Sequence, residues 1–172
     1  RAGTCDGNSI SSIHQKQLEQ YADFPVGNYT HSIQPKRSRA LTHTVYGWYP
    51  YWMGDAYLNL DWDLISHISF FSMEANSSGQ ITNDHYWPQN WSGLIATAQN
   101  AGITLTLTCT LFSSSAINTL IGNATYRSNL ITNLIAECQA GNAQGVNIDF
   151  EGSGLNAANL VTFMTELRTA FD

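Results

Sequence analysis

The chain has 172 residues, close to the size of one domain, and 43% of them are hydrophobic, which is enough for a sizeable core. Only 12% are charged, and 7 Lys and Arg residues stand against 13 Asp and Glu residues, which argues against nucleic-acid binding because such binding depends on basic side chains. Aromatic residues make up 12%, which argues against a disordered chain.

The basic residues are concentrated near the amino terminus. Five of the seven precede residue 41, and the rest of the chain has two basic residues against ten acidic ones. A neutral substrate suits such an acidic body better than an anionic polymer does. No run of about 18 apolar residues is present, so no membrane span is predicted. A surface rich in Asn, Ser and Thr and poor in Lys favours a secreted or cell-envelope protein.

Residues 1–42 are predicted to form a lead-in before the main domain. Apolar residues at loosely helical spacing predict one helix over residues 9–21. Pro25, Gly27 and Pro35 then interrupt regular structure, and residues 36–39 read as a basic, solvated connector. We therefore expect a helix and a loop in this part of the chain.

Residues 43–172 alternate between strand and helix patterns. Segments rich in β-branched and aromatic residues predict strands, and apolar residues at helical spacing predict helices. Strands are predicted at 43–49, 64–72, 103–111 and 145–151, and helices at 61–66 (a short link), 91–101, 114–121, 125–140 and 155–171. Such alternation is typical of βα units around a parallel sheet.

The cysteines and histidines indicate neither a disulfide framework nor a metal site. The chain has three cysteines, an odd count that cannot pair completely within the chain. Cys109 falls in a strand pattern and Cys138 in a helix pattern, so we expect both to be buried free thiols. The five histidines lack metal-ligand spacing, and no glycine-rich phosphate loop follows the first strand. We expect no metal and no cofactor, and the missing loop argues against a flavodoxin-like domain.

The segment Gly-Val-Asn-Ile-Asp-Phe-Glu at residues 145–151 carries the clearest chemical signal. Side chains alternate along a strand, so Asn147, Asp149 and Glu151 share one face. In a parallel strand covered by helices both faces are normally apolar, and a polar row is costly unless it serves a function. The alternative is an ordinary half-solvated strand. The ends of parallel strands are where α/β barrel enzymes place their catalytic groups.

Two carboxyl groups side by side have a specific chemical consequence. Like charges on one strand face cannot both ionise without cost, so one pKa is expected to rise. A carboxyl group that stays neutral can protonate a leaving group. Glu151, nearest the end of the strand, is the candidate acid, and Asp149 is the candidate charged group that orients the substrate.

The same segment resembles the catalytic strand of glycoside hydrolase family 18, the chitinases and related N-acetylglucosaminidases. The family pattern is Asp-Gly-x-Asp-x-Asp-x-Glu, and residues 144–151 read Gln-Gly-Val-Asn-Ile-Asp-Phe-Glu. The match keeps Gly145, Asp149 and Glu151 and departs at Gln144 and Asn147. Asn147 at the second of these positions is similar to the motif of the branch that contains bacterial spore-cortex and cell-wall glucosaminidases. The segments at 103–123 and 126–151 are also similar to that branch, and the segment at 45–52 resembles the first strand of the family. The resemblance covers about residues 43–172 and keeps the order of strands one to four.

The resemblance implies a substrate-assisted, retaining hydrolysis of β-1,4-linked N-acetylglucosamine polymers, either chitin or peptidoglycan-type glycans. Glu151 would protonate the glycosidic oxygen, and the carbonyl of the substrate's own N-acetyl group would attack the anomeric carbon. Asp149 would hold the acetamido N–H, and Asn147 would form a hydrogen bond to Asp149. Gln144 begins the strand and is expected to matter for packing.

Aromatic residues near the predicted strand ends are candidate sugar platforms, because the flat C–H faces of sugars pack on aromatic rings. Core packing is the equally open alternative for these residues. Glu74 reads as a solvated loop acid or a cleft residue, and Trp87 and Trp91 read as walls of a long loop. The candidate substrate-binding residues are Tyr46, Trp48, Tyr49, Trp52 and Phe70, with Tyr51 beside them.

The length matches only part of the implied fold. A (β/α)8 barrel typically needs about 250 residues, so residues 43–172 supply its amino-terminal half with strands one to four. We expect either a missing carboxyl-terminal half or self-association of two chains that completes a barrel. A non-catalytic carbohydrate-binding member of the family, or a half-barrel inactive by itself, is the alternative to an enzyme.

Overall fold

The computed structural model describes residues 13–22 and 41–172. A parallel sheet runs through it in the order β1-β2-β4-β5, and a short strand, β3, pairs antiparallel with the end of β2. Because each strand lies beside its predecessor in the parallel set, the topology is that of half a (β/α)8 barrel. The strands are β1 (Tyr46–Pro50), β2 (His67–Ala75), β3 (Ile81–Asn83), β4 (Thr104–Leu111) and β5 (Val146–Phe150).

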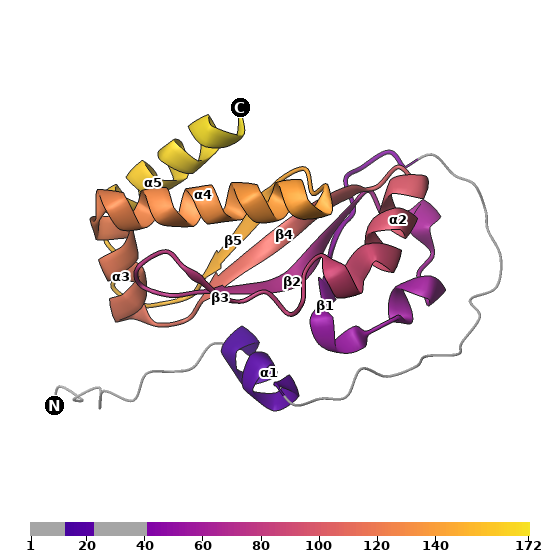
Figure 1. The fold of residues 1–172 in the computed structure, drawn as a ribbon, viewed down its shortest axis with the longest axis horizontal. Coiled ribbons are helices and arrows are strands. Elements are labelled where there is room, and N and C mark those ends of the chain that lie inside the picture. The colour runs from indigo at the N-terminus through magenta and orange to yellow at the C-terminus, as the bar shows by residue number, and fades with distance from the viewer. Residues whose placement is uncertain (1–12, 23–40) are drawn as a thin grey trace, which may run out of the picture.

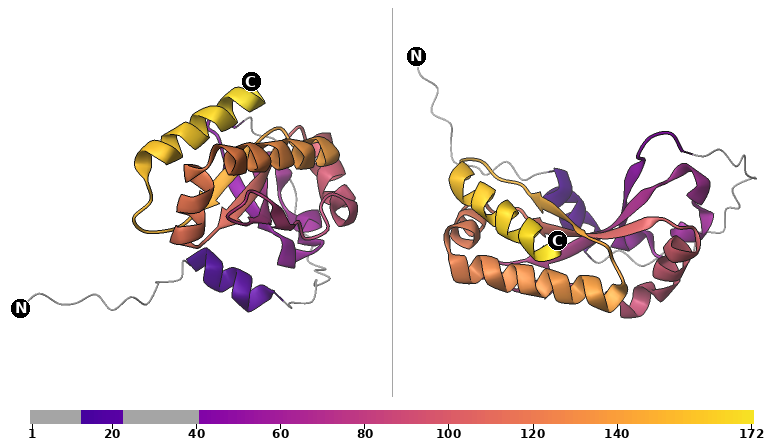
Figure 2. Two further views of the ribbon diagram at one scale, coloured as in Figure 1. Left: turned by 60° about the vertical axis from the view of Figure 1, so that its left-hand side comes forward. Right: turned by 90° about the horizontal axis from the view of Figure 1, so that it is seen from above.

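The helices lie on both sides of this sheet (Figures 1 and 2). Helices α2 to α5 cover one face, and α1 lies against the opposite face. The predicted strands and longer helices are confirmed within the described residues, and residues 9–12 of the first predicted helix lie outside them. Strand β3 and the 3-10 turns at Tyr51–Met53 and Ala56–Asn59 were not predicted. The helices are α1 (Ile13–Tyr21), α2 (Ser92–Asn100), α3 (Ser114–Gly122), α4 (Ala124–Gly141) and α5 (Ala157–Phe171). The predicted link at 61–66 is a 3-10 turn over Trp62–Leu64.

The sequence of β4 explains why the two faces of the sheet differ. Leu105, Leu107 and Cys109 are almost fully buried among the apolar residues that pack beneath the covering helices. The alternate threonines of β4 occupy the other face, which we call the inner face. There Thr108 shares a 2.8 Å hydrogen bond between hydroxyl oxygens with Ser69 of β2. The inner face is therefore polar, and this buried pair of hydroxyl groups is satisfied.

Asparagine side chains set several helix ends. Asn123 accepts hydrogen bonds from two backbone N–H groups at the start of α4, and Asn156 accepts one at the start of α5. Asn142 ends α4 in the left-handed conformation, with a φ of 57°. These positions suit Asn because its short polar side chain caps a helix start and tolerates left-handed backbone.

Gln144, which departs from the family pattern, links β5 to β4. Its Oε1 accepts a 2.7 Å hydrogen bond from the backbone N–H of Leu105, and its Nε2 donates to the carbonyl of Asn142. Its backbone N–H also donates to the carbonyl of Leu105 at 2.7 Å. Gln144 therefore has the structural role expected of it, because its hydrogen bonds fix the start of β5 against β4.

An ion pair joins helices α4 and α5. The guanidinium of Arg127, 8% exposed, donates to both carboxylate oxygens of Glu166 at 2.7 and 2.8 Å and also to the carbonyl of Ile121. The hydrogen bonds from Arg127 hold the pKa of Glu166 below its ordinary value. The Arg127–Glu166 pair therefore stabilises the fold fully at pH values above the unfolded-state pKa of Glu166. This stabilisation is lost as the pH falls through the lower pKa that Glu166 has in the folded state.

We expect Glu166→Gln to lower the free energy of unfolding at pH 7 by about 1–2 kcal/mol, because the Arg127 guanidinium loses its carboxylate partner. The loss stays below the value for a fully buried pair because the Glu166 side chain is 40% exposed. Urea unfolding followed by circular dichroism measures it. Asp172→Asn is the control, since the Arg168–Asp172 pair is mostly exposed; equal effects of the two substitutions would contradict this account.

The isolated 172-residue chain is expected to self-associate. Strand β5 ends the described sheet, and all five of its residues keep some exposure. Trp48, Val161 and Met164 expose 55%, 65% and 43% of their surface. Unpaired strand edges and apolar patches favour association. Light scattering on purified chain measures its mass, and a monodisperse, thermally stable monomer would contradict the expectation.

Cys109 and Cys138 are buried free thiols, as the sequence predicts. Burial is the main cause that raises the pKa of each thiol to about 12. Cys5 and the basic residues 36–39 lie outside the described residues. Among the helices described, none combines the length and apolar character needed to cross a membrane.

Candidate active site at the end of strand β5

The backbone around Asp149 and Glu151 is held at the carboxyl end of the sheet. Asp149 lies opposite Thr110 of β4, and the N–H of Glu151 donates to the carbonyl of Leu111 at 3.2 Å. The loop that follows packs closely on the start of α3. A side chain at Gly152 would lie 2.8 Å from the hydroxyl of Ser114, so the close approach requires glycine there.

The two carboxylates are half-buried and point the same way. Their side chains are 16% exposed for Asp149 and 30% exposed for Glu151. Burial raises the pKa of Asp149 above its ordinary value; His14 opposes this rise, and the charge of Glu151 adds to it. The sequence led us to expect the raised pKa on Glu151 and a charged carboxylate at Asp149. The raised pKa is found instead on Asp149, because burial of this deeper group is the largest cause.

Asn147 lies one step deeper on the same strand face, opposite Thr108 of β4. The family resemblance implies a hydrogen bond between Asn147 and Asp149, but the structure shows none between these two described residues. Asn147 therefore lies below the carboxylates on the same strand face and is not hydrogen-bonded to Asp149.

His14 of helix α1 completes the cluster and was missed by the sequence analysis. Its Nδ1 lies 2.9 Å from Oδ2 of Asp149 and 2.8 Å from Oε1 of Glu151. Its ring also meets Phe71 at 5.5 Å between centroids and Phe112 at 6.4 Å. His14 and Asp149 are 135 residues apart in sequence, so no local spacing pattern could have revealed the contact.

The same three side chains are also a possible metal-ligand set. Their donor atoms lie within 4.8 Å of one another, and imidazole and carboxylate groups are common zinc ligands. However, the distances of 2.8 and 2.9 Å from Nδ1 to the two oxygens are hydrogen-bond lengths. Two ligands that share a tetrahedral zinc at about 2.0–2.2 Å lie roughly 3.4 Å apart. The geometry thus favours direct pairing over a metal.

Trp52 connects to this cluster through Phe71. It meets Phe71 edge-on at 6.0 Å between centroids, and Phe71 in turn contacts His14. Tyr21 of α1 stacks on Trp52 at 4.7 Å with the rings 9° from parallel. Trp52 is consequently only 7% exposed in this arrangement.

Tyr46 and Trp48 lie on β1 toward the inner face. The hydroxyl of Tyr46 is 2.8 Å from that of Thr106, and the rings of Tyr46 and Trp48 meet edge-on at 5.4 Å. Trp48 is 55% exposed. Both side chains are therefore on the side of the sheet that carries the carboxylates, and their contact with substrate stays a prediction.

Tyr49 and Phe70 lie on the other side, in the core beneath the helices. Phe70 has no exposed surface and contacts Trp87 and Trp91, which are themselves buried. The Tyr49 hydroxyl donates to the carbonyl of Gly54 and accepts from the N–H of Tyr57. The structure does not bring these side chains to the site, because strand alternation turns them toward the helices. Core packing, the open alternative, explains them.

Comparison with known proteins gives a consistent answer for the fold. The chain resembles a chitinase from Bacteroides thetaiotaomicron with a TM-score of 0.63 and 16% identity, over 74% of this chain and 42% of that one. It resembles a class V chitinase from Nicotiana tobaccum with a TM-score of 0.60 and 23% identity, over 73% and 38%. A Bacillus subtilis protein described as a sporulation-specific glycosylase matches with a TM-score of 0.52 and 27% identity, over 59% and 34%.

The chain has the fold of a chitinase half-barrel. It spans about 42% of the length of the Bacteroides chitinase. No family model and no curated protein matches the sequence itself. The four parallel strands β1, β2, β4 and β5 are the barrel strands predicted from the sequence, and β3 is an addition after the second of them.

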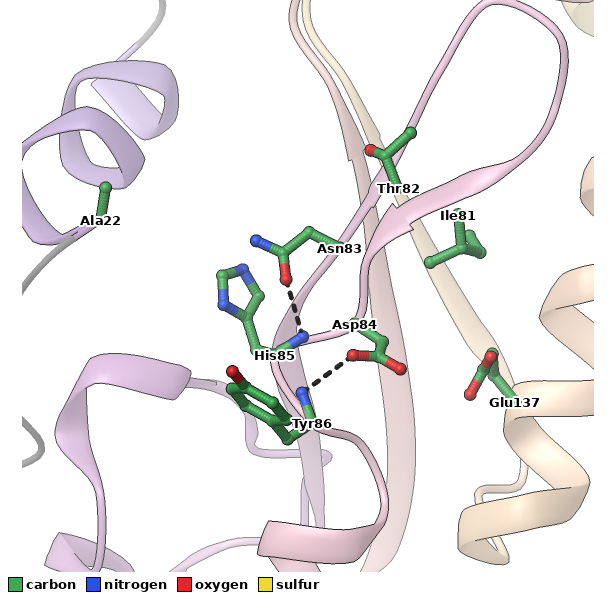
Figure 3. Close-up of a pocket in the computed structure, with 8 residues that line it drawn as sticks. All are labelled: Ala22, Ile81, Thr82, Asn83, Asp84, His85, Tyr86 and Glu137. Atoms are coloured by element: carbon green, nitrogen blue, oxygen red, sulfur yellow. Dashed lines mark hydrogen bonds between the residues drawn. The ribbon is translucent and has the colours of Figure 1, made fainter.

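A separate hollow of about 520 Å³ lies beside this half-barrel's β3 (Figure 3). His85 and Tyr86 line it in left-handed backbone, and side chains of Asn83 and Asp84 accept hydrogen bonds from their N–H groups. His85 also pairs with Glu74 at 3.0 Å. Glu74 thus supports the β3 loop, and neither Asp149 nor Glu151 lines this hollow.

Proposed function

We propose that the protein, with a completed barrel, hydrolyses β-1,4-linked N-acetylglucosamine polymers by a retaining, substrate-assisted mechanism. The observation that carries the proposal is the convergence of Asp149 and Glu151 at the carboxyl end of a barrel strand in a chitinase fold. Barrel enzymes place their catalytic groups at that edge.

In this proposal Glu151 is the general acid. It is the more exposed of the two carboxyl groups and stands at the rim, where a glycosidic oxygen can reach it. Asp149 lies deeper, and its side chain is 16% exposed. Its task is to hold the acetamido N–H and to stabilise the positive charge that develops when the acetamido carbonyl attacks the anomeric carbon. Asn147 lines the site below Asp149.

The sugar would lie across the inner face. Trp52, which contacts the cluster through Phe71, would offer one aromatic platform, and Trp48 would offer a second one along β1. The scarcity of Lys and Arg after position 40, where only two occur, fits a neutral polysaccharide. The proposal places the protein outside the cell or in the cell envelope, where chitin and peptidoglycan occur.

A non-catalytic carbohydrate-binding role is the second candidate. The low identity to the chitinases and the partial coverage of their barrels favour it. The retained Glu151 favours the enzyme, because a binding protein does not need the acid.

Hydrolysis of defined substrates tests the proposal. The protein as its gene encodes it is incubated with the N-acetylglucosamine hexamer and, separately, with purified peptidoglycan glycan strands, and products are followed by mass spectrometry. We expect shorter oligosaccharides from at least one substrate. Binding by calorimetry without cleavage would support the carbohydrate-binding role instead. If the protein neither binds nor cleaves any of these substrates, both candidate functions are refuted.

A further inference from the structure

Helix α1 presents one continuous face to the site. His14, Leu18 and Tyr21 lie on that face, because positions four and seven residues apart fall on one side of a helix. Leu18 and Tyr21 pack against the core cluster that includes Trp52. Lys16 and Gln20 are exposed and point away from the barrel. The helix therefore contacts the inner face through a specific set of side chains.

The first end of this face meets the carboxylates. His14 places one nitrogen within 2.9 Å of Asp149 and 2.8 Å of Glu151. In the proposed function these two carboxyl groups act at the glycosidic oxygen and the acetamido N–H. The imidazole lies against one oxygen of each and so takes up space beside both groups that a sugar would use.

The second end of the face covers the aromatic platform. Tyr21 is two helical turns from His14, a rise of about 10 Å. It stacks on Trp52 nearly parallel, with centroids 4.7 Å apart. That is the arrangement in which a sugar ring would pack on the indole, so Tyr21 fills the position of the sugar. Carboxylates and platform are occupied by the same helix.

We propose that helix α1 is an intramolecular plug that holds the site closed and competes with the polysaccharide for it. The inference rests on the proposed function of that site. His14 mimics the polar contacts of the substrate with Asp149 and Glu151, and Tyr21 mimics the stacking of a sugar on Trp52. Displacement of α1 opens both subsites together.

Helix α1 is held weakly enough for a substrate to displace it. Helix α1 has nine residues and none of them is fully buried. Isolated helices shorter than about 12–15 residues are marginal in water, so α1 depends on its contacts with the barrel rather than on its own helicity. A substrate that takes over those contacts therefore removes the main support of the helix.

The test compares a double variant with a matched control in the protein as its gene encodes it. His14→Ala with Tyr21→Ala removes both contacts, and Lys16→Ala with Gln20→Ala makes the same number of truncations on the exposed side of α1. Two readouts are taken. One is kcat/KM on the N-acetylglucosamine hexamer. The other is hydrogen exchange of the α1 amides by mass spectrometry, which reports the contact without any need for activity.

We expect kcat/KM to rise at least tenfold in the double variant and to stay within twofold of wild type in the control. The α1 amides should exchange faster in the double variant, and in wild type they should exchange faster when the hexamer is added. Equal kcat/KM in wild type and double variant, with hydrolysis present in both, overturns the plug and leaves the proposed function standing.

Two further outcomes overturn the inference in distinguishable ways. Absence of both cleavage and binding of the hexamer in every form overturns the proposed function, and the plug with it. A rise of wild-type kcat/KM to the level of the double variant on addition of EDTA alone means that a metal joins His14, Asp149 and Glu151. That result overturns direct pairing.

Discussion

Glu151→Gln is expected to lower kcat on an N-acetylglucosamine oligosaccharide by at least about 10²–10⁴-fold, the usual contribution of general acid catalysis. The amide keeps the size and most hydrogen bonds of the side chain but cannot deliver a proton to the leaving oxygen. The backbone of residue 151 is held by Leu111 and by the close packing of Gly152 on Ser114, so the substitution should leave the fold intact. Steady-state kinetics of the protein with a completed barrel measures the loss of kcat.

Glu74→Gln is the matched control for this experiment. Glu74 is also a carboxylate near the carboxyl end of a barrel strand, but its side chain pairs with His85 and accepts from Asn83 in the β3 loop. We expect it to keep turnover within a few-fold of wild type. Turnover near the wild-type level in Glu151→Gln, or equal losses in the two variants, would refute the assignment of Glu151 as the acid.

Hydrolysis is expected to require the N-acetyl group of the sugar on the non-reducing side of the cleaved bond. A retaining enzyme with a protein nucleophile places two carboxyl groups on opposite sides of the sugar. Here Asp149 and Glu151 project from one strand face, and one oxygen of each reaches the same His14 nitrogen. In the proposed function they would approach the sugar from one side, so Asp149 would not be placed to attack from the other. We therefore expect the acetamido carbonyl of the substrate to act as the nucleophile.

Matched oligosaccharides with and without N-acetylation at that sugar measure this dependence. We expect the deacetylated sugar to be cleaved at least about 10²-fold more slowly, since it lacks the positioned nucleophile. Asp149→Asn should impair the reaction less than Glu151→Gln, because Asp149 supports the acetamido group and does not transfer the proton. Equal cleavage of both oligosaccharides would show that the mechanism is wrong and that another residue acts as the nucleophile.

The sequence alone determined the βα order, the inner polar face and the carboxylate pair. These features depend on local periodicity: threonines alternate with apolar residues in β4, and Asp149 and Glu151 are two residues apart on one strand. Helix ends at Asn123, Asn142 and Asn156 also depend on local chemistry, since each side chain or backbone conformation acts within a few residues. The chain therefore encodes its half-barrel largely through short-range patterns.

Only the tertiary structure decided which aromatic residues belong to the site and what covers it. Trp48 and Tyr49 are adjacent in sequence, yet alternation and the helix layer place Trp48 in the open and Tyr49 in the core. The contacts of His14 with Asp149 and of Tyr21 with Trp52 join segments far apart in sequence. Such contacts depend on where helix α1 docks against the sheet, and docking is set by packing between distant elements, which periodicity does not encode.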